Sequence, residues 1–117
     1  MPTIRDLVAT LRAREGVQAA VVLGRDGLVI DGQALAALDI ENVAAHVPSI
    51  LIAAEELAHA SQQGEMQTSV LEQERGYAIV ANLSPEAVLL VLADPTVHLA
   101  QLLYELRRNR ANLASLV

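Results

Sequence analysis

The chain has 117 residues, of which 53% are apolar and 19% charged, and its formal net charge is −6. It contains no cysteine, phenylalanine, tryptophan or lysine, so disulfides, thiolate metal sites and cysteine nucleophiles are excluded and the core has to be aliphatic. An acidic chain whose basic residues are not interleaved with aromatic ones also argues against binding to nucleic acid.

Residues 3–16 predict an amphipathic helix. Asp6 stands three residues after Thr3, which is close to the capping-box spacing at a helix start, and Gly16 is suited to end the helix. The apolar residues of this segment recur at helical spacing: Ile4, Leu7, Val8 and Leu11.

A β-hairpin is predicted after this helix. Residues 17–23 are almost continuously apolar, and an Asp-Gly step lies in the tight turn predicted at residues 24–27. Residues 28–31 are the returning strand, and small residues at 32–38 form a loop into the next element.

One long helix is predicted between Asp39, a good N-cap residue, and Gly64, the residue type expected just past a helix end. It would be about 36 Å long at about 1.5 Å per residue. Because a chain of this length has a radius of gyration of about 13 Å, this helix has to cross the whole domain. Its apolar residues share one broad arc: Ile40, Val43, Ala44, Val47, Ile50, Leu51, Ala54, Leu57 and Ala58.

Two residues of this helix bear on its shape and its contacts. Pro48 removes a backbone hydrogen bond in a helix interior, so we expect a kink near residues 44–48 or a break into two helices. Ile52 falls on the polar side of the helix. It is either an ordinary isolated apolar residue on the surface or part of a contact with another chain.

Three strands and a final helix are predicted in the rest of the chain. Residues 66–73 alternate with a period of two, and residues 77–83 follow after a turn. Residues 87–93 are apolar at every position, as in a central strand covered on both faces. The final helix starts after Asp94-Pro95 and carries an apolar stripe: Leu99, Leu102, Leu103, Leu106, Leu113 and Val117.

The predicted order is therefore α-β-β-α-β-β-β-α. Two hairpins and a meander build one five-stranded antiparallel sheet, and the apolar strands require helices on both of its faces. The predicted fold class is α+β, arranged as a three-layer α/β/α sandwich.

Three segments carry a resemblance to a known family: the hairpin GVQAAVVLGRDGLVI at residues 16–30, the strand AVLLVLAD at 87–94 and the helix LAQLLYELRR at 99–108. With the element order, they resemble the Roadblock/dynein light-chain family, whose fold is similar to that of profilin. Within it, the chain looks most like the small single-domain bacterial members, which include the Mgl-type regulators of Ras-like GTPases.

The resemblance implies that residues 1–117 form a single Roadblock/dynein light-chain domain. It implies a sheet order of 2-1-5-4-3, with the long helix alone on one face and the two terminal helices on the other. It also implies a homodimer in which the third strands pair edge to edge and the long helices lie side by side.

The sequence of the third strand independently favours such a dimer. This stretch has no charge and no proline, so at a sheet edge it lacks the usual protection against pairing with another chain. The alternative is that it forms a short edge that stays unpaired. The predicted dimer edge consists of Met66, Gln67, Thr68, Ser69 and Val70.

Motifs for catalysis or cofactor binding are absent. There is no phosphate-binding G-x-x-x-x-G-K-[ST] loop and no serine in a nucleophile elbow. Glu55, Glu56 and His59 have a helical spacing that suits some metal sites, but without further ligands a solvated helix face is the better interpretation. We therefore predict no catalytic, cofactor or metal site, and a protein that is not an enzyme.

Three arginines cluster near the end of the final helix: Arg107, Arg108 and Arg110. They complement the negative end of the helix dipole, or they contact an anion or an acidic partner. A third interpretation is an arginine finger, which the Mgl-type resemblance argues against, because those regulators reposition the GTPase's own catalytic residues.

The leading hypothesis is a homodimeric regulator of, or binding platform for, a small Ras-like GTPase. The predicted contact surface is the outer side of the paired long helices: Glu41, Ala45, Pro48, Ser49, Ile52, Glu56 and His59. The alternatives are a passive dimeric scaffold and, less favoured because the core is aliphatic, a small-molecule sensor. No apolar run approaches the roughly 18 residues of a membrane span, so we expect a cytoplasmic protein without membrane insertion.

Overall fold

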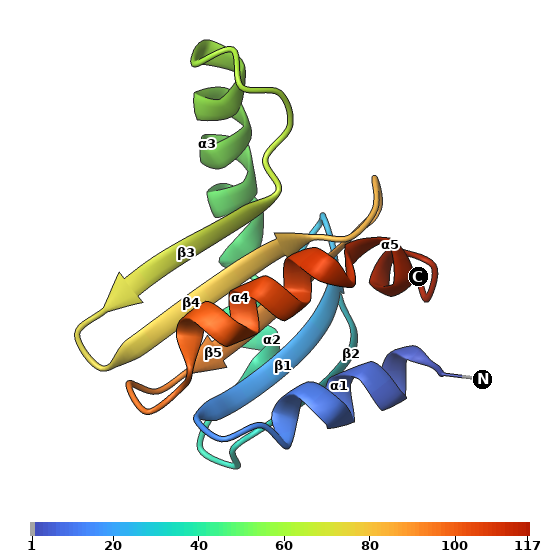
Figure 1. Cartoon of the computed structure of the whole chain (residues 1–117), viewed down its shortest axis with the longest axis vertical. Helices are drawn as coiled ribbons and strands as arrows, with labels where there is room; N and C mark the ends of the chain where they lie inside the picture. Colours follow the sequence, from blue (N-terminus) through green and yellow to red (C-terminus); the bar gives the residue numbers. More distant parts are fainter. Residues whose placement is uncertain (1) are drawn as a thin grey trace.

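The computed structural model describes residues 2–117, which form a five-stranded antiparallel sheet between two layers of helices (Figure 1). The sheet order is β2-β1-β5-β4-β3, so the predicted fold and strand order are confirmed. The elements in chain order are α1 Ile4–Arg12, β1 Val17–Gly24, β2 Val29–Ala34, α2 Ile40–Ala44, α3 Val47–Ala60, β3 Thr68–Gln73, β4 Gly76–Asn82, β5 Ala87–Ala93, α4 Leu99–Arg108 and α5 Arg110–Ala114.

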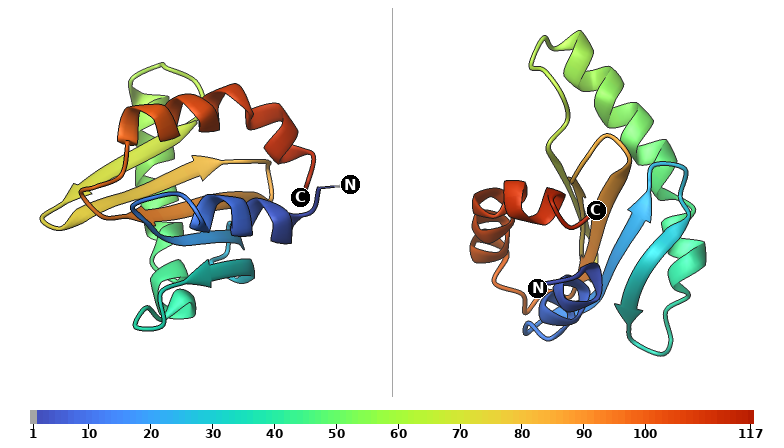
Figure 2. Two further views of the ribbon diagram at one scale, coloured as in Figure 1. Left: turned by 60° about the horizontal axis from the view of Figure 1, so that its bottom comes forward. Right: turned by 90° about the vertical axis from the view of Figure 1, so that its right-hand side faces the viewer.

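The three central strands bury apolar side chains on both faces of the sheet. On one face, residues such as Val22, Ile79 and Leu89 pack with α1 and α4. On the other face, residues such as Val80 and Leu90 pack with α2 and α3. The terminal helices therefore share one face, and the α2–α3 segment covers the other alone, as predicted (Figure 2).

Pro48 divides the predicted long helix into two. The first part, α2, ends at Ala44, and α3 begins at Val47, so Pro48 occupies the first turn of α3. In a first turn the backbone N–H has no acceptor within the helix, so proline costs little there. The expected kink or break is thus confirmed as a break, with a two-residue connection before α3.

Several boundaries differ from the prediction. The first helix ends at Arg12, short of Gly16, and β2 extends to Ala34, three residues beyond the predicted strand. The third strand begins at Thr68, because Met66 is only 8% exposed and its side chain enters the core beneath α3. Met66 therefore does not share a strand face with Thr68, contrary to the predicted alternation.

The final helix is also interrupted. The apolar stripe predicts one element to Val117, but the helix divides at Asn109 into α4 and α5. The side-chain amide of Asn109 donates to the carbonyl of Glu105 at 2.9 Å, so it competes with the backbone for that acceptor.

The C-terminal half of α3 extends past the sheet. In Figures 1 and 2 this helix crosses one face of the sheet and continues beyond β3, the edge strand. Val47 and Leu51 are accordingly buried, whereas Leu57 is 70% exposed. The prediction that Leu57 lies on a buried arc is wrong for the single chain, because no strand lies beneath this part of the helix.

The end of α3 is formed by Gln62 rather than by Gly64. The backbone N–H of Gln62 donates to the carbonyl of His59 at 3.1 Å, and that of Gln63 donates to the carbonyl of Ala58 at 3.0 Å. This pair of bonds defines a Schellman cap. It places Gln62 in the left-handed region at φ 58°, where a side chain is strained and glycine is favoured.

Replacing Gln62 with glycine is expected to stabilise the fold by about 0.5–1 kcal/mol, because relief of the left-handed strain exceeds the entropy that glycine loses on folding. Urea unfolding measures the change. The matched control is Gln63→Gly, where φ is negative and the same replacement should be neutral or destabilising. A Gln62→Gly variant that is less stable than the wild type would contradict this account of the cap.

Candidate functional site

The predicted partner surface follows one exposed stripe of α3. Four of its residues recur at spacings of three or four and are all exposed: Ser49, Ile52, Glu56 and His59. Ile52 is 59% exposed among polar neighbours, so the expected apolar residue on a polar side is present on the surface.

The other three residues of that surface lie around the break. Glu41 and Ala45 are exposed, on α2 and directly after it. Pro48 is half-buried and packs against the β1–β2 turn, where a Cβ added to Gly27 would lie 3.1 Å from its ring. The structure therefore distributes the seven residues over two consecutive helices and the connection between them, rather than along one helix.

The predicted dimer edge lies at the margin of the sheet. β3 pairs only with β4 among the strands of residues 2–117, so its outer backbone groups face no strand. Thr68 and Val70 are in register with Ala81 and Ile79, which face α4, so they share that face. Val70 is 38% exposed. Ser69 lies on the opposite face, and Met66 and Gln67 precede the strand.

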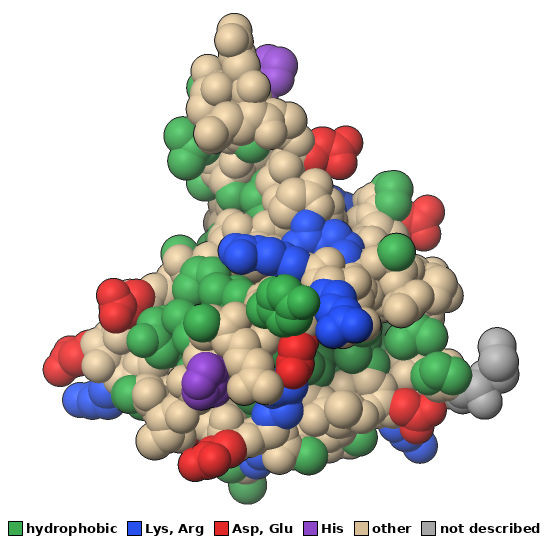
Figure 3. Space-filling view, viewed as in Figure 1, with side chains coloured by type: hydrophobic (Ala, Val, Ile, Leu, Met, Phe, Trp, Pro, Cys, Tyr) green, Lys and Arg blue, Asp and Glu red, His purple; other side chains and the backbone are tan. Residues whose placement is uncertain are grey.

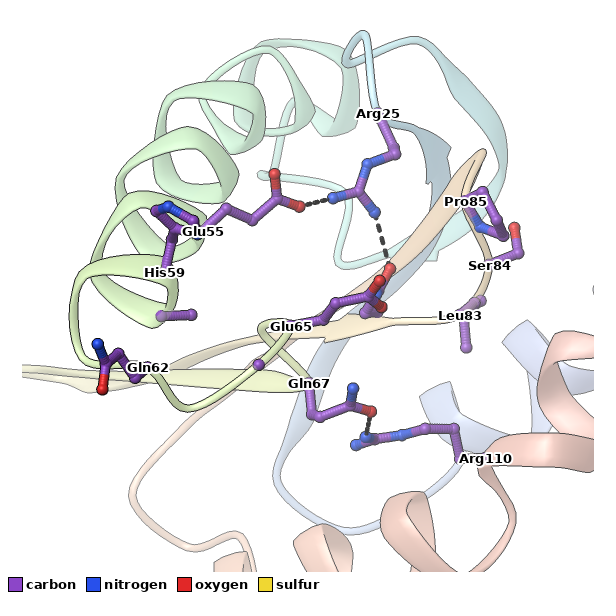
Figure 4. Close-up of a pocket in the computed structure, with 13 residues that line it drawn as sticks. Arg25, Glu55, His59, Gln62, Glu65, Gln67, Leu83, Ser84, Pro85 and Arg110 are labelled. Carbon is purple, nitrogen blue, oxygen red and sulfur yellow. Dashed lines mark hydrogen bonds and ion pairs between the residues drawn. The ribbon is translucent and has the colours of Figure 1, made fainter.

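A cleft of about 940 Å³ opens between the overhanging half of α3 and the end of β4 (Figure 4). Its walls include Arg25 from the β1–β2 turn, Glu55 and His59 from α3, and Arg110 from α5. In the sequence Arg25 is notable only as part of a predicted turn, so the cleft is a finding of the structure.

Arg25 forms hydrogen bonds to α3, to the end of β4 and to the β4–β5 turn at this cleft. Its guanidinium donates to the Glu55 carboxylate on α3 and, at 2.7 Å, to the Asn82 side-chain oxygen at the end of β4. Its backbone N–H donates to the carbonyl of Glu86 at 3.2 Å. The ion pair with Glu55 holds α3 at the point where the helix leaves the sheet.

The same ion pair bears on the metal-like spacing in α3. Glu55 is engaged by Arg25, and within residues 2–117 there is no group of three or more histidine, cysteine, aspartate or glutamate side chains placed to hold a metal ion. The described residues therefore add no further metal ligands to Glu55, Glu56 and His59.

The three C-terminal arginines form a basic patch over the end of α4 and the start of α5 (Figure 3). We call Arg107, Arg108 and Arg110 the arginine patch. The first two lie in the last turn of α4, where they complement its dipole. Arg110 belongs to α5 instead, and it donates to the side chains of Gln67 and, at 2.7 Å, Thr68. No local pattern in the sequence signals this contact across the fold.

Arg107 and Arg110 also line a groove of about 520 Å³ that runs to the start of β3 and the exposed side of α3. Leu57 and Ser69 lie along the same groove. Arg108 does not line it, although it is exposed. The predicted dimer edge, the overhanging helix and two arginines thus meet at one margin of the molecule.

None of the helices in residues 2–117 has the length and apolar character needed to cross a membrane.

A five-stranded sheet of order 2-1-5-4-3, covered by one helical segment on one face and by the terminal helices on the other, defines the class of this protein. Residues 3–93 match the family model of the Roadblock/LC7 domain. The chain therefore belongs to the Roadblock/LC7 domain family.

Known proteins are similar to the chain in sequence or in fold. The uncharacterised protein MJ0310 of Methanocaldococcus jannaschii is 32% identical over 98 residues, which is 84% of this chain and 85% of that protein. The gliding protein MglB of Thermus thermophilus superposes with a TM-score of 0.83 at 20% identity, covering 96% of this chain and 86% of that one. An MglB in a tetrameric arrangement also gives 0.83, at 21% identity and coverage of 96% and 85%. At these identities the two structures show the fold.

The ion pair between Arg25 and Glu55 is expected to contribute modestly to the free energy of unfolding, because the side chains are 25% and 48% exposed. A double-mutant cycle of Arg25→Met and Glu55→Gln should give a coupling of about 0.5 kcal/mol that weakens with added salt. Arg25→Met alone should cost about 1–2 kcal/mol, because Asn82 also loses a charged donor.

The unfolding free energy in urea measures both effects. The control cycle combines Arg25→Met with Glu56→Gln, the neighbouring carboxylate, and should show no coupling. Equal coupling in the two cycles would mean that Glu55 is not the specific partner of Arg25.

Proposed function

We propose that the chain, as one Roadblock domain, forms a homodimer through β3 and α3, and that this dimer is a regulatory platform for a small Ras-like GTPase. The observation that carries the proposal is the coincidence of an unpaired edge strand and an overhanging, partly apolar helix at the same margin. A second copy of the chain satisfies both features at once.

The proposed dimer interface would cover an unpaired strand edge and exposed leucines of the single chain. An exposed strand edge is a template for pairing with another chain, and β3 has neither proline nor lysine to prevent it. Leu57 on α3 and Leu71 on β3 are 70% and 36% exposed. Two-fold pairing of β3 would place the overhanging part of each α3 over the sheet of its partner.

The platform is supported by family membership and by the stripe on α3. The Mgl-type regulators that this sequence resembles act on Ras-like GTPases, and one similar MglB is described in a tetrameric arrangement. Two stripes centred on Ile52, brought together by a two-fold axis, would form one composite surface. A single subunit offers only half of this surface.

Light scattering is expected to give about 25 kDa, twice the 12.5 kDa of the chain. Leu57→Glu should shift the protein toward 12.5 kDa, because it places a charge where the partner would cover α3. The matched control is Leu28→Glu in the β1–β2 turn, where the leucine is 71% exposed. A wild type that remains monomeric at micromolar concentration would reject the dimer.

GTP hydrolysis by a small GTPase encoded near this gene is expected to change when the protein is added, and the two should co-elute on gel filtration. Ile52→Glu should abolish both effects without altering the melting temperature. Tyr104→Glu on the opposite layer, where the tyrosine is 60% exposed, is the control. A complex without a change in rate would favour the passive scaffold, and the absence of both would reject the platform.

A further inference from the structure

None of the ion pairs formed within residues 2–117 involves an arginine of the arginine patch. Within residues 2–117 the three arginines that approach a carboxylate are Arg5, Arg14 and Arg25. Arg110 uses part of its guanidinium on two uncharged side chains, and a guanidinium has five N–H donors. Glu65 is the one acidic residue that lines the groove with Arg107 and Arg110, and among residues 2–117 it forms no ion pair with them.

Uncompensated negative charge lies at the other end of the same strand. Glu72 is the penultimate residue of β3 and Glu74 lies in the following turn. Both are exposed and outside the ion pairs of residues 2–117. Arg75 is the one cation of this turn, so residues 72–75 carry two negative charges and one positive charge. The edge strand β3 is therefore basic at its start, through the arginines over it, and acidic at its end.

The two charged ends lie on the same face of the sheet. Thr68, which accepts from Arg110, is in register with Ala81, and Glu72 is in register with Tyr77. Ala81 and Tyr77 both belong to the core beneath α1 and α4. Glu72 thus projects toward the face that carries the arginines, and not toward α3.

Antiparallel pairing of β3 with a second copy reverses one strand, so the basic start of each strand meets the acidic end of the other. Directly opposed residues must share a face of the sheet. Pairing about Val70 satisfies this condition and sets Thr68 opposite Glu72 of the partner subunit. Pairing about Leu71 would instead set Val70 opposite that carboxylate on both sides of the axis. It would exchange the Val70–Val70 contact for a Leu71–Leu71 contact, and it would move Glu72 two residues away from Thr68.

We propose that Arg107 and Arg110 of each subunit bind Glu72 of the partner subunit, and that these two symmetric charge clusters fix the register of a β3–β3 dimer centred on Val70. The proposal rests on the dimer put forward above and names the contacts that orient it. Opposed residues on one face have Cβ atoms about 4.5–5.5 Å apart, so a carboxylate opposite Thr68 lies within reach of the guanidinium bound to Thr68. The partner's Glu72 would also supply the ion pair that Arg107 and Arg110 do not form with Glu65 of their own chain.

Charge reversal tests the ion pairs. Sedimentation equilibrium of Glu72→Arg and of Arg110→Glu is expected to show dimers about tenfold weaker than the wild type, because each change acts twice. An equimolar mixture of these two variants should form a heterodimer close to wild-type affinity, since opposite charges then face each other at both contacts. The wild-type dimer itself should weaken between about 0.05 M and about 0.5 M NaCl.

Matched controls separate this contact from general charge effects. Arg108→Glu and Glu15→Arg make the same changes of charge at exposed positions outside the groove and should leave the dimer unchanged. Circular dichroism confirms that each variant is folded. A wild-type dimer unaffected by Glu72→Arg, or variants that do not recover on mixing, would overturn the ion pairs while leaving the dimer. A monomeric wild type would overturn the proposed dimer as well.

The register has its own test, because the chain has no cysteine. Val70→Cys is expected to form a disulfide-linked dimer on mild oxidation, since the two residues oppose each other across the axis. Leu71→Cys should not, because the two cysteines would be two residues out of register. Their Cα atoms would then be farther apart than the roughly 7 Å that a disulfide can bridge. Linkage through Leu71→Cys in place of Val70→Cys would overturn the register.

Discussion

Both faces of the sheet have to be covered, because β1, β4 and β5 carry apolar side chains on each side. The terminal helices meet this requirement together on one face, whereas the α2–α3 segment has to meet it alone on the other. A straight helix that crosses a twisted sheet cannot follow every strand. The segment breaks before Pro48, and α3 then covers the centre of the sheet and continues past β3.

The overhang explains why the functional features gather at one margin. Where α3 leaves the sheet, Arg25 links Glu55 to the end of β4. On the other face Arg110 reaches the start of β3 from α5. The edge strand is thus held by its pairing with β4 and by Arg110, but it has an open outer side. The geometry that completes the core of one chain also prepares the surface that we assign to a second chain.

The sequence predicted features that depend on local pattern. The uninterrupted apolar run of β5, the Asp-Gly turn and the effect of Pro48 all follow from residue type and spacing, and the structure contains each of them. Features that depend on contacts between distant segments could not be found in this way. Leu57 has the spacing of a buried residue but no strand beneath it, and the contact of Arg110 with Thr68 spans 42 residues. The left-handed cap at Gln62 was missed because Gly64 offered a better residue two positions later.

The exposed half of α3 would make the rate at which proteases degrade the protein depend on the protein's own concentration. A helix segment that loses its apolar cover in the monomer opens more readily to proteases, and association stabilises it by mass action. In the proposed assembly, each subunit made at low expression would be cleared faster than one made at high expression. The concentration of intact protein would then rise more than in proportion to its rate of synthesis. Such a dependence would produce a threshold in protein level without a separate mechanism that controls degradation.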